Sequence, residues 1–423
     1  MALVVAKFGG SSVATPERVK NVAQKLVSRH KSGDQVVVVV SAMGDNTDYL
    51  LDLAHSVNPT PPTREMDMLL ATGEQVSVAV LAMAITALGV PAVSHTGAQV
   101  GIITDATHTK AKIDRIVGVD TVKRDLNEGN IVVVAGFQGI DANGDITTLG
   151  RGGSDTTAVA IAAAIEADSC EIYSDVDGVY TADPRVCPKA HRLDRLSYEE
   201  MLEMSANGAG VLQLRAVEFA RNYGVVIHAL STFLQDSKGT IIEEAPDRMN
   251  NAGSMEGAVI SGVAHDLSEA KVTFRHVPDT EGVAARIFET MATIGANVDM
   301  IIQDISHEGL TDISFTAPLD DVQRITDAAE ALCKEIKAQG VEVNTHVAKV
   351  SLIGAGMKSY PGVAAKMFRT LADNNINISM ISTSPIRISI VVDADQCTAA
   401  VNCLHTAFGL DEDEEPGTVK VVR

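Results

Sequence analysis

The chain has 423 residues, too many for one compact core, so we expect two or three domains. Its 55 Asp and Glu residues outnumber its 34 Lys and Arg residues, and the net charge of −21 argues against nucleic acid as a partner. No apolar run reaches the ~18 residues of a membrane span, no secretory signal is visible and the five cysteines form no C-x-x-C pair, so the sequence predicts a cytoplasmic protein without disulfides or a thiolate zinc site.

Short apolar strands alternate with helical stretches over residues 1–245. The predicted buried strands are Leu3–Ala6, Val36–Val40, Ile131–Val134 and Cys170–Tyr173. Thr15 and Pro16 mark the start of the first helix, because proline is tolerated at the first helical position. A long helical pattern covers Arg64–Leu88, and an Asn-Gly pair predicts a hairpin at Asp141–Asp145. The alternation predicts an α/β domain whose mostly parallel sheet lies between helix layers.

The second part of the chain is an internal duplication. After a linker at 246–264, residues 282–301 match residues 362–381 at ten of twenty positions with a constant offset of 80. Each copy starts with a strand, turns at a glycine into a helix, and continues as strand, strand, helix and strand. This βαββαβ order predicts two ferredoxin-like domains, at 265–345 and 346–423.

A glycine turn directly after the first strand is the first candidate site. Its sequence is Lys7-Phe8-Gly9-Gly10-Ser11-Ser12. Glycines let backbone amides approach an anion, and an ammonium neutralises a transferring phosphoryl group, so we interpret the turn as phosphate-binding. A tight turn with a surface lysine explains it equally well. Neither the P-loop spacing nor the dinucleotide-binding fingerprint is present.

A second glycine run, Gly150–Asp155, leads into an Ala-rich helix predicted at Thr157–Ile165. Its amides would lie at a helix N-terminus, and Arg151 beside them suits a carboxylate, which arginine binds through two parallel hydrogen bonds. The alternative is that Ser154 or Asp155 only caps the helix.

The polar loop Ser174–Arg185 follows another buried strand. Open α/β sheets bind ligands outside the carboxyl ends of their strands, so this loop is a third candidate site. The alternative is an ordinary surface loop.

Five segments together resemble the signature segments of aspartate kinases, in the family's order and at its spacing. They are Lys7–Ser12, Val40–Asp45, Gly73–Glu74, Thr148–Asp155 and Ser174–Arg185. The resemblance covers essentially the whole chain and implies an amino acid kinase fold followed by two ACT domains. It also implies ATP-dependent phosphorylation of the L-aspartate β-carboxylate to 4-phospho-L-aspartate, the first step towards lysine, threonine, methionine and diaminopimelate.

The resemblance implies a role for each matched residue. Lys7 would contact the transferring phosphoryl group and Asp155 would orient the phosphate-binding groups, with no covalent intermediate. The implied ATP-binding residues are Lys7, Phe8, Gly9, Gly10, Ser174, Asp175, Tyr180 and Arg185. The implied aspartate-binding residues are Ser41, Thr47, Glu74, Arg151, Gly152, Gly153 and Ser154, with Glu74 on the α-ammonium and Arg151 on the α-carboxylate. Mg²⁺ would screen the phosphates through phosphate and water oxygens, so no protein metal ligand is implied.

The ACT repeats imply regulation. Lysine, threonine or both would inhibit, and the repeats would pair into at least a dimer, or pair with a separately made regulatory subunit. The implied effector residues are Asp279, Gly282, Val283, Asn297, Asp299 and Gln303 in the first repeat and Gly362, Val363, Asn377, Ile378 and Ser382 in the second.

Three positions depart from the family pattern. Gly210 stands where relatives carry a lysine that reaches ATP, and the lost contact would cost about 2–4 kcal/mol of transition-state stabilisation unless Arg215 replaces it. Glu281 replaces a common proline and Pro385 a common glutamate, which leaves the effector's identity open.

Two other functions remain open from the sequence. One is a catalytically weakened relative that acts as an amino-acid-binding regulator, and the other is a kinase of a different substrate, such as glutamate or a carbamate. The complete set of Lys7, Glu74, Arg151 and Asp155 favours an aspartate kinase.

Overall fold

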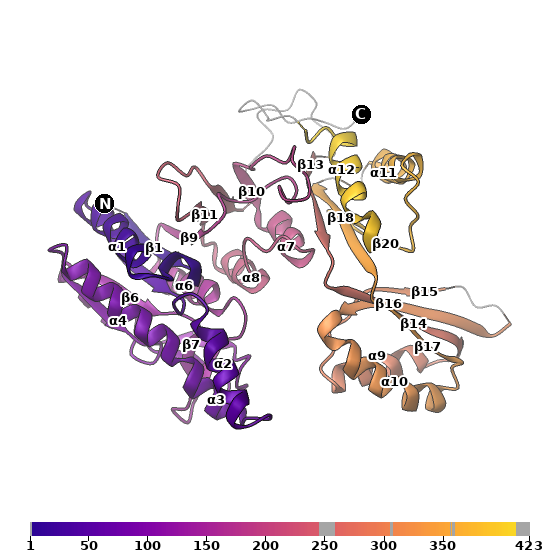
Figure 1. Cartoon of the computed structure of the whole chain (residues 1–423), viewed down its shortest axis with the longest axis horizontal. Helices are drawn as coiled ribbons and strands as arrows, with labels where there is room; N and C mark the ends of the chain where they lie inside the picture. Colours follow the sequence, from indigo (N-terminus) through magenta and orange to yellow (C-terminus); the bar gives the residue numbers. More distant parts are fainter. Residues whose placement is uncertain (1, 245–258, 305–307, 356, 358–359, 412–423) are drawn as a thin grey trace. The chain divides into compact units, whose positions relative to one another are not determined.

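The computed structural model describes residues 2–244, 259–304, 308–355, 357 and 360–411 (Figure 1). The chain forms two compact units. The first unit consists of Met1–Val179, Arg192–Ser205 and Gly210–Arg248, and the second of Tyr180–His191, Ala206–Ala209 and Met249–Arg423. Two short segments from the first half of the sequence therefore belong to the second unit.

A single large sheet organises the first unit. In the described residues it has eight strands in the order β10-β12-β11-β9-β1-β2-β6-β3. Their bounds are β1 (Leu3–Phe8), β2 (Gln35–Val40), β3 (Ala92–His95), β6 (Ile131–Ala135), β9 (Ser169–Ser174), β10 (Arg195–Ser197), β11 (Ile227–Ser231) and β12 (Thr240–Glu243). All neighbours pair in parallel except β11 and β12. The four predicted strands are confirmed as β1, β2, β6 and β9, adjacent at the sheet centre.

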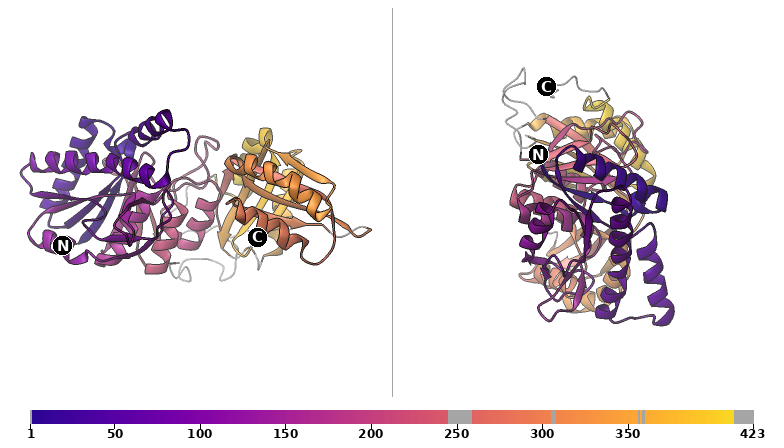
Figure 2. Two further views of the ribbon diagram at one scale, coloured as in Figure 1. Left: turned by 90° about the horizontal axis from the view of Figure 1, so that it is seen from below. Right: turned by 90° about the vertical axis from the view of Figure 1, so that its left-hand side faces the viewer.

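Helices cover both faces of this sheet, as the views in Figure 2 show. Their bounds are α1 (Pro16–Lys31), α2 (Asn46–Val57), α3 (Thr63–Leu70), α4 (Thr72–Thr86), α5 (Val119–Asn127), α6 (Gly153–Ile165), α7 (Tyr198–Ala206) and α8 (Leu214–Tyr223). α1 and α4 pack on one face, while α6 lies against β1, β2 and β9. Thr15 caps α1 as predicted, and its hydroxyl accepts a hydrogen bond from the Arg18 amide.

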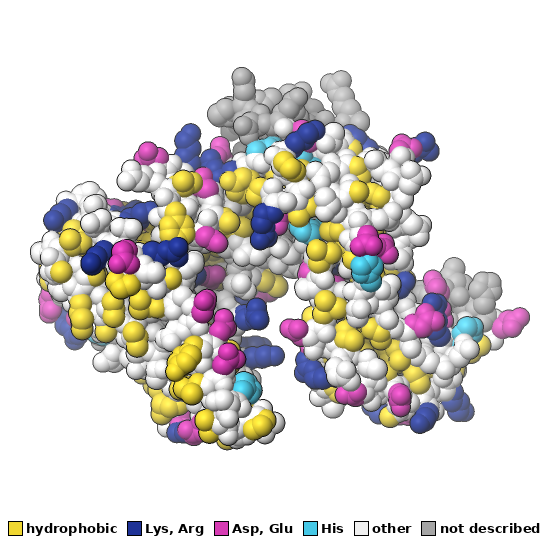
Figure 3. Space-filling model, in the orientation of Figure 1, with side chains coloured by type: hydrophobic (Ala, Val, Ile, Leu, Met, Phe, Trp, Pro, Cys, Tyr) yellow, Lys and Arg dark blue, Asp and Glu magenta, His cyan; other side chains and the backbone are white. Residues whose placement is uncertain are grey.

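The helical pattern predicted at Arg64–Leu88 is two consecutive helices, α3 and α4, separated at Ala71. Together, Thr63–Thr86 is long and apolar enough to cross a membrane by length and composition. Apolar core helices pass the same test, and Leu81 and Ile85 of α4 are fully buried in the core beneath the sheet. Hydrophobic side chains also lie on the outer surface of this helical region (Figure 3), among them Met83, which is 68% exposed.

A second, smaller sheet in the first unit has the order β5-β4-β7-β8. Its strands are β4 (Ile102–Thr104), β5 (Ile113–Ile116), β7 (Gln138–Ile140) and β8 (Ile146–Thr148). β7 and β8 form the predicted hairpin, with Gly144 at φ +85° in the turn. The Asp141 carboxylate fixes this turn by accepting the Asn143 and Asp145 amides.

The first repeat of the second unit has the predicted βαββαβ order. Its elements are β14 (Glu269–Pro278), α9 (Val283–Thr293), β15 (Asp299–Gln303), β16 (Leu310–Pro318), α10 (Val322–Ile336) and β17 (Gly340–Asn344). The strands form an antiparallel sheet in the order β15-β16-β14-β17, which is the ferredoxin-like arrangement.

The second repeat completes its sheet differently from the prediction. Its own elements are β18 (Val347–Ala355), α11 (Pro361–Asp373), β19 (Met380–Ser384), β20 (Arg387–Asp393) and α12 (Cys397–Ala407). The strand beside β18 is β13 (Val259–Asp266), which precedes the first repeat in the sequence. Residues 259–264, predicted as linker, are therefore part of a sheet, where Val263 is buried in the core. Residues 246–258 of that linker lie outside the described residues.

The loop 180–191 packs into the core of the second repeat. Ala182 and Cys187 are buried in one cluster with β18, α11 and α12 side chains. The Thr181 hydroxyl lies 2.8 Å from His405 Nε2, and the Asn402 side-chain amide donates to the Val186 carbonyl. The candidate nucleotide loop thus begins in the first unit and ends as part of the second unit's core.

This packing predicts the reactivity of one thiol. In a chain that ends at residue 244, Cys187 loses the core in which it is 1% exposed, so a thiol reagent should modify it, whereas the intact folded chain should protect it. Mass spectrometry of the labelled peptides measures both.

Cys170 in β9 is the internal control, because it is fully buried within the first unit and should stay unmodified in both chains. Modification of both thiols would report general unfolding of the shortened chain. Equal protection of Cys187 in the two chains would contradict the packing.

Candidate active site

A buried ion pair joins the first two candidate sites. Lys7 lies in β1 and Asp155 in the first turn of α6, and Lys7 Nζ is 2.6 Å from Asp155 Oδ1. The two side chains are only 12% and 8% exposed. The structure therefore brings together the two residues predicted to act on the phosphoryl group.

The glycine turn after β1 lies against the loop after β2. The Ser41 amide donates to the Phe8 carbonyl, and the Gly44 amide donates to the Gly10 carbonyl. A Cβ on Gly10 would lie 2.8 Å from the Ala42 carbonyl oxygen, so the close approach requires glycine. The Phe8 side chain is buried and stacks on Tyr173 at 4.5 Å, which leaves only its backbone for a nucleotide.

Glu74 presents a buried carboxylate to this region from the first turn of α4. Its Oε1 accepts the Ala42 amide at 2.9 Å, while its Oε2 is buried without a hydrogen-bond partner among the described residues. Burial raises the pKa of Glu74 to about 7. An unpaired buried carboxylate oxygen is costly, and a cationic ligand would offset that cost. Ser41, beside the Ala42 amide that Glu74 accepts, and Thr47, in the first turn of α2, are half-buried.

The second glycine run is the N-terminus of α6. Gly152, at φ +70°, occupies the N-cap position, so the alternative that Ser154 or Asp155 caps the helix is wrong. Both are buried within the first turn, one turn earlier than the predicted helix start. Arg151 is exposed beside them. This geometry combines helix amides and an exposed guanidinium, which together favour an anionic ligand.

The residues predicted to hold the nucleotide divide between the two units. Ser174 ends β9 and Asp175 follows it in the first unit, at the same end of the sheet as Lys7, because β1 and β9 are parallel. Tyr180 and Arg185 belong to the second unit, where Arg185 forms an ion pair with Asp183 at 2.7 Å.

Arg215, the predicted replacement for the family lysine, is hydrogen-bonded to the backbone. Its two terminal nitrogens donate to the Leu149 and Ala111 carbonyl oxygens, both at 2.8 Å. Gly210 itself is open, since no atom lies within 4 Å of a Cβ built there. The guanidinium joins two backbone segments, and the hypothesis that Arg215 supplies the lost charge stays a prediction.

The predicted effector residues lie mostly at the surface of the two repeats. Val363 is the exception, because its side chain is 1% exposed and packs in the core. Asp299 pairs at 3.2 Å with Lys349, a buried lysine that also contacts Glu269 at 3.1 Å. Lys271 reaches the Ser379 carbonyl. Ser379 is the position equivalent to Asp299 under the offset of 80. A lysine from each repeat therefore contacts this equivalent position in the other repeat.

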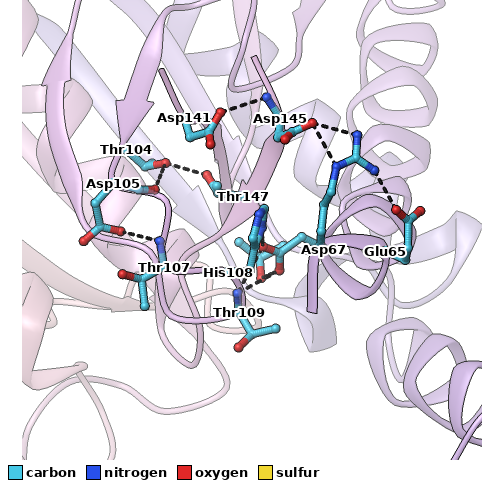
Figure 4. A network of polar contacts seen from close by, with 12 residues as sticks. Glu65, Asp67, Thr104, Asp105, Thr107, His108, Thr109, Asp141, Asp145 and Thr147 are labelled. Atoms are coloured by element: carbon cyan, nitrogen blue, oxygen red, sulfur yellow. Dashed lines mark hydrogen bonds and ion pairs between the residues drawn. The ribbon is translucent and has the colours of Figure 1, made fainter. Parts of the chain in front are cut away.

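Sequence reasoning missed one polar cluster near the active site. Asp67, in α3, is fully buried and contacts His108, Thr109 and Thr148 (Figure 4). Its acidic side chain lies among charged and apolar neighbours in the predicted helix at Arg64–Leu88, so the sequence gives no signal that marks it as buried.

Comparison with known proteins identifies the families of both parts of the chain. The amino acid kinase family matches residues 2–230, and the ACT domain matches residues 275–335 and 350–408. An aspartokinase from Mycolicibacterium smegmatis is 53% identical over 418 residues, covering 98% of both chains. An aspartokinase from Pseudomonas aeruginosa is 50% identical over 99% of this chain and 100% of its own length.

Solved structures show the same architecture. Clostridium acetobutylicum aspartate kinase aligns with a TM-score of 0.76 at 25% identity, covering 96% of this chain and 100% of its own. Escherichia coli aspartokinase III, solved in complex with aspartate and ADP, aligns with a TM-score of 0.77 at 24% identity over 96% of this chain and 99% of its own, which supports the fold. Because the chain is 50% or more identical to these aspartokinases over nearly its full length, it belongs to the aspartate kinases, with an amino acid kinase domain followed by ACT domains.

Proposed function

We propose that the site at the carboxyl ends of β1, β2 and β9 transfers the γ-phosphoryl group of ATP to the β-carboxylate of L-aspartate, using the residues described above. A β-carboxylate oxygen forms a bond to the γ-phosphorus as the bond to the departing ADP breaks, so no covalent enzyme intermediate is needed. The observation that carries the proposal is the buried Lys7–Asp155 pair beside loops that backbone hydrogen bonds hold together.

The proposed roles follow from charge. Lys7 and the Gly9 and Gly10 amides stabilise the negative charge of the transferring group. Asp155 holds the Lys7 ammonium in place through their 2.6 Å contact. The residues suit the anionic phosphates of a nucleotide, because a lysine ammonium lies beside a glycine turn after β1. Mg²⁺, bound through phosphate and water oxygens, would supply further charge neutralisation.

Aspartate is proposed to bind between opposite charges. Glu74 Oε2, buried without a partner among the described residues, takes the α-ammonium, and the exposed Arg151 takes the α-carboxylate. Ser41, Thr47 and the backbone of 152–154 complete this subsite, while Ser174, Asp175, Tyr180 and Arg185 serve the nucleotide. We place the reaction in the cytoplasm.

Trapping the product tests the reaction and the role of Lys7. With ATP, Mg²⁺ and hydroxylamine, L-aspartate should yield aspartate hydroxamate. Lys7→Ala should slow the reaction roughly 100- to 1000-fold, because it removes a charge placed at the transferring group.

Lys20→Ala is the matched control, since Lys20 is exposed on α1. It should leave the rate unchanged. Folded wild-type protein that forms no hydroxamate would reject the reaction, and a Lys7→Ala variant as fast as the Lys20→Ala variant would reject the role of Lys7.

Glu74 makes aspartate binding dependent on pH. Only the ionised carboxylate attracts the α-ammonium, so kcat/KM for aspartate should fall as the pH drops through about 7, the value to which burial raises the Glu74 pKa. The pH profile of the KM for ATP is the internal control and should lack this inflection.

The same carboxylate makes the stability of the ligand-free protein fall as the pH rises, although aspartate binding improves. The folded protein holds the Glu74 proton up to a pKa of about 7, compared with an ordinary value of 4.5, so the free energy of unfolding falls as the pH rises from about 4.5 through 7. Glu74→Gln should therefore raise the unfolding free energy of the ligand-free protein near pH 8 by up to about 3 kcal/mol while abolishing the pH dependence of aspartate binding. Denaturant titrations that show a less stable variant at this pH would contradict the assignment.

Regulation is proposed to act through the ACT repeats of an assembly that is at least a dimer. Millimolar lysine, threonine or both should inhibit, and Asp279→Ala or Gln303→Ala should raise the inhibitor concentration needed by about tenfold, equivalent to ~1.4 kcal/mol, while sparing basal turnover. Gln323→Ala, an exposed position on α10, is the control. A monomer in light scattering together with unchanged kinetics at both amino acids would reject this proposal.

A further inference from the structure

We propose that Asp67 is a positioning residue for aspartate binding, because its buried carboxylate fixes the backbone that leads to Arg151. The inference rests on the proposed role of Arg151 and adds to it a residue that does not touch the substrate.

Asp67 connects three separate segments of the first unit. It lies in α3, and its side chain is 0% exposed. The carboxylate lies 2.7 Å from His108 Nδ1, accepts the Thr109 amide at 3.0 Å on both oxygens, and accepts the Thr148 hydroxyl at 2.5 Å (Figure 4). A buried carboxylate with this many donors is well compensated, so its removal leaves several polar groups without partners.

One of the segments that Asp67 contacts leads directly to Arg151, and the other is hydrogen-bonded to it. Thr148 ends β8, three residues before Arg151, and its carbonyl accepts the Ala111 amide. Arg215 holds the same two segments a second time, through the Leu149 and Ala111 carbonyls. Residues 109–111 and 148–149 are therefore fixed to one another by side chains from α3 and α8.

The backbone of Thr109 is held in a strained conformation at the point where Asp67 binds it. Thr109 has φ +68°, a left-handed conformation that a β-branched residue rarely adopts, and its amide is the one that both Asp67 oxygens accept. A Cβ built on Gly150 would lie 3.1 Å from the Thr109 carbonyl oxygen. The strained residue thus packs directly against the loop that presents Arg151.

A second buried aspartate provides a matched comparison. Asp125, on α5, is 5% exposed and lies 2.7 Å from His95 Nε2, so it forms the same kind of His–Asp contact. Its other side-chain partner is Arg124, which is adjacent in the sequence. Asp125 therefore has a similar structural role but contacts no segment of the active site.

The experiment compares Michaelis constants for aspartate and ATP across four variants. Asp67→Ala should raise the KM for aspartate about tenfold or more, with the KM for ATP within about twofold of wild type. Asp67→Asn should restore most of the wild-type value, because its oxygen still accepts the Thr148 hydroxyl and the Thr109 amide. Thr148→Val, which removes one hydroxyl at nearly constant size, should raise the KM for aspartate by a smaller factor and supplies the test if Asp67→Ala does not fold. Asp125→Ala should leave both constants near wild type.

Two results would overturn the inference. If Thr148→Val and Asp67→Ala lower only the apparent kcat and leave both Michaelis constants unchanged, as a loss of folded protein would, or raise the constants for aspartate and ATP equally, Asp67 is only structural. Arg151→Ala, measured alongside, separates this failure from that of the proposed function. A raised KM for aspartate in Arg151→Ala without one in the Asp67 and Thr148 variants rejects the positioning role alone, whereas an unchanged KM in Arg151→Ala rejects both.

Discussion

The ion pair between Lys7 and Asp155 is the interaction on which the active site depends. It joins the central strand β1 to the first turn of α6. The Lys7 ammonium lies near the carboxyl end of β1, where most water is excluded. Breaking a buried pair by removing one partner typically costs about 3–5 kcal/mol, so each residue fixes the other. Because β1 lies between β2 and β9 and pairs with both in parallel, the loops that follow these strands lie at the same end of the sheet.

Burial of the Glu74 carboxylate lowers the stability of the ligand-free protein, and a cationic ligand would offset that loss. A buried carboxylate with one oxygen unpaired in the described structure destabilises the ligand-free protein, and its raised pKa reports that cost. The ammonium of a bound amino acid would relieve it. Arg151 differs in kind, since it is exposed and depends on its loop for position. The network of Asp67, Thr109, Thr148 and Arg215 supplies the rigidity that the arginine itself lacks.

Local signals in the sequence were sufficient for the four central strands, one hairpin and one helix start of the first unit. The four central strands are runs of buried apolar residues, and the Asn-Gly hairpin and the Thr15 cap depend only on neighbouring residues. The pairing of β13 with β18 was missed, because its partner lies beyond the whole first repeat. The burial of Ala182 and Cys187 in the second repeat was missed for the same reason.

The candidate site was predicted through motifs, and its supporting contacts were not. Lys7, Glu74 and Arg151 stand in recognisable segments, whereas Asp67 is one of two acids in a short helix, and its partners are 41, 42 and 81 positions away. Arg215 was predicted as a substitute cation because charge is visible in a sequence, but its hydrogen bonds to two carbonyls are visible only in the fold.

The central claim is that one site brackets aspartate between Glu74 and Arg151 and meets the γ-phosphate at Lys7. A crystal structure of the chain with L-aspartate, Mg²⁺ and a non-hydrolysable ATP analogue tests it most directly. The account predicts the α-ammonium at Glu74 Oε2, the α-carboxylate at the Arg151 guanidinium and a γ-phosphate oxygen within hydrogen-bond distance of Lys7 Nζ. Aspartate bound with its α-ammonium away from Glu74, or a nucleotide whose phosphates do not contact Lys7, would contradict it.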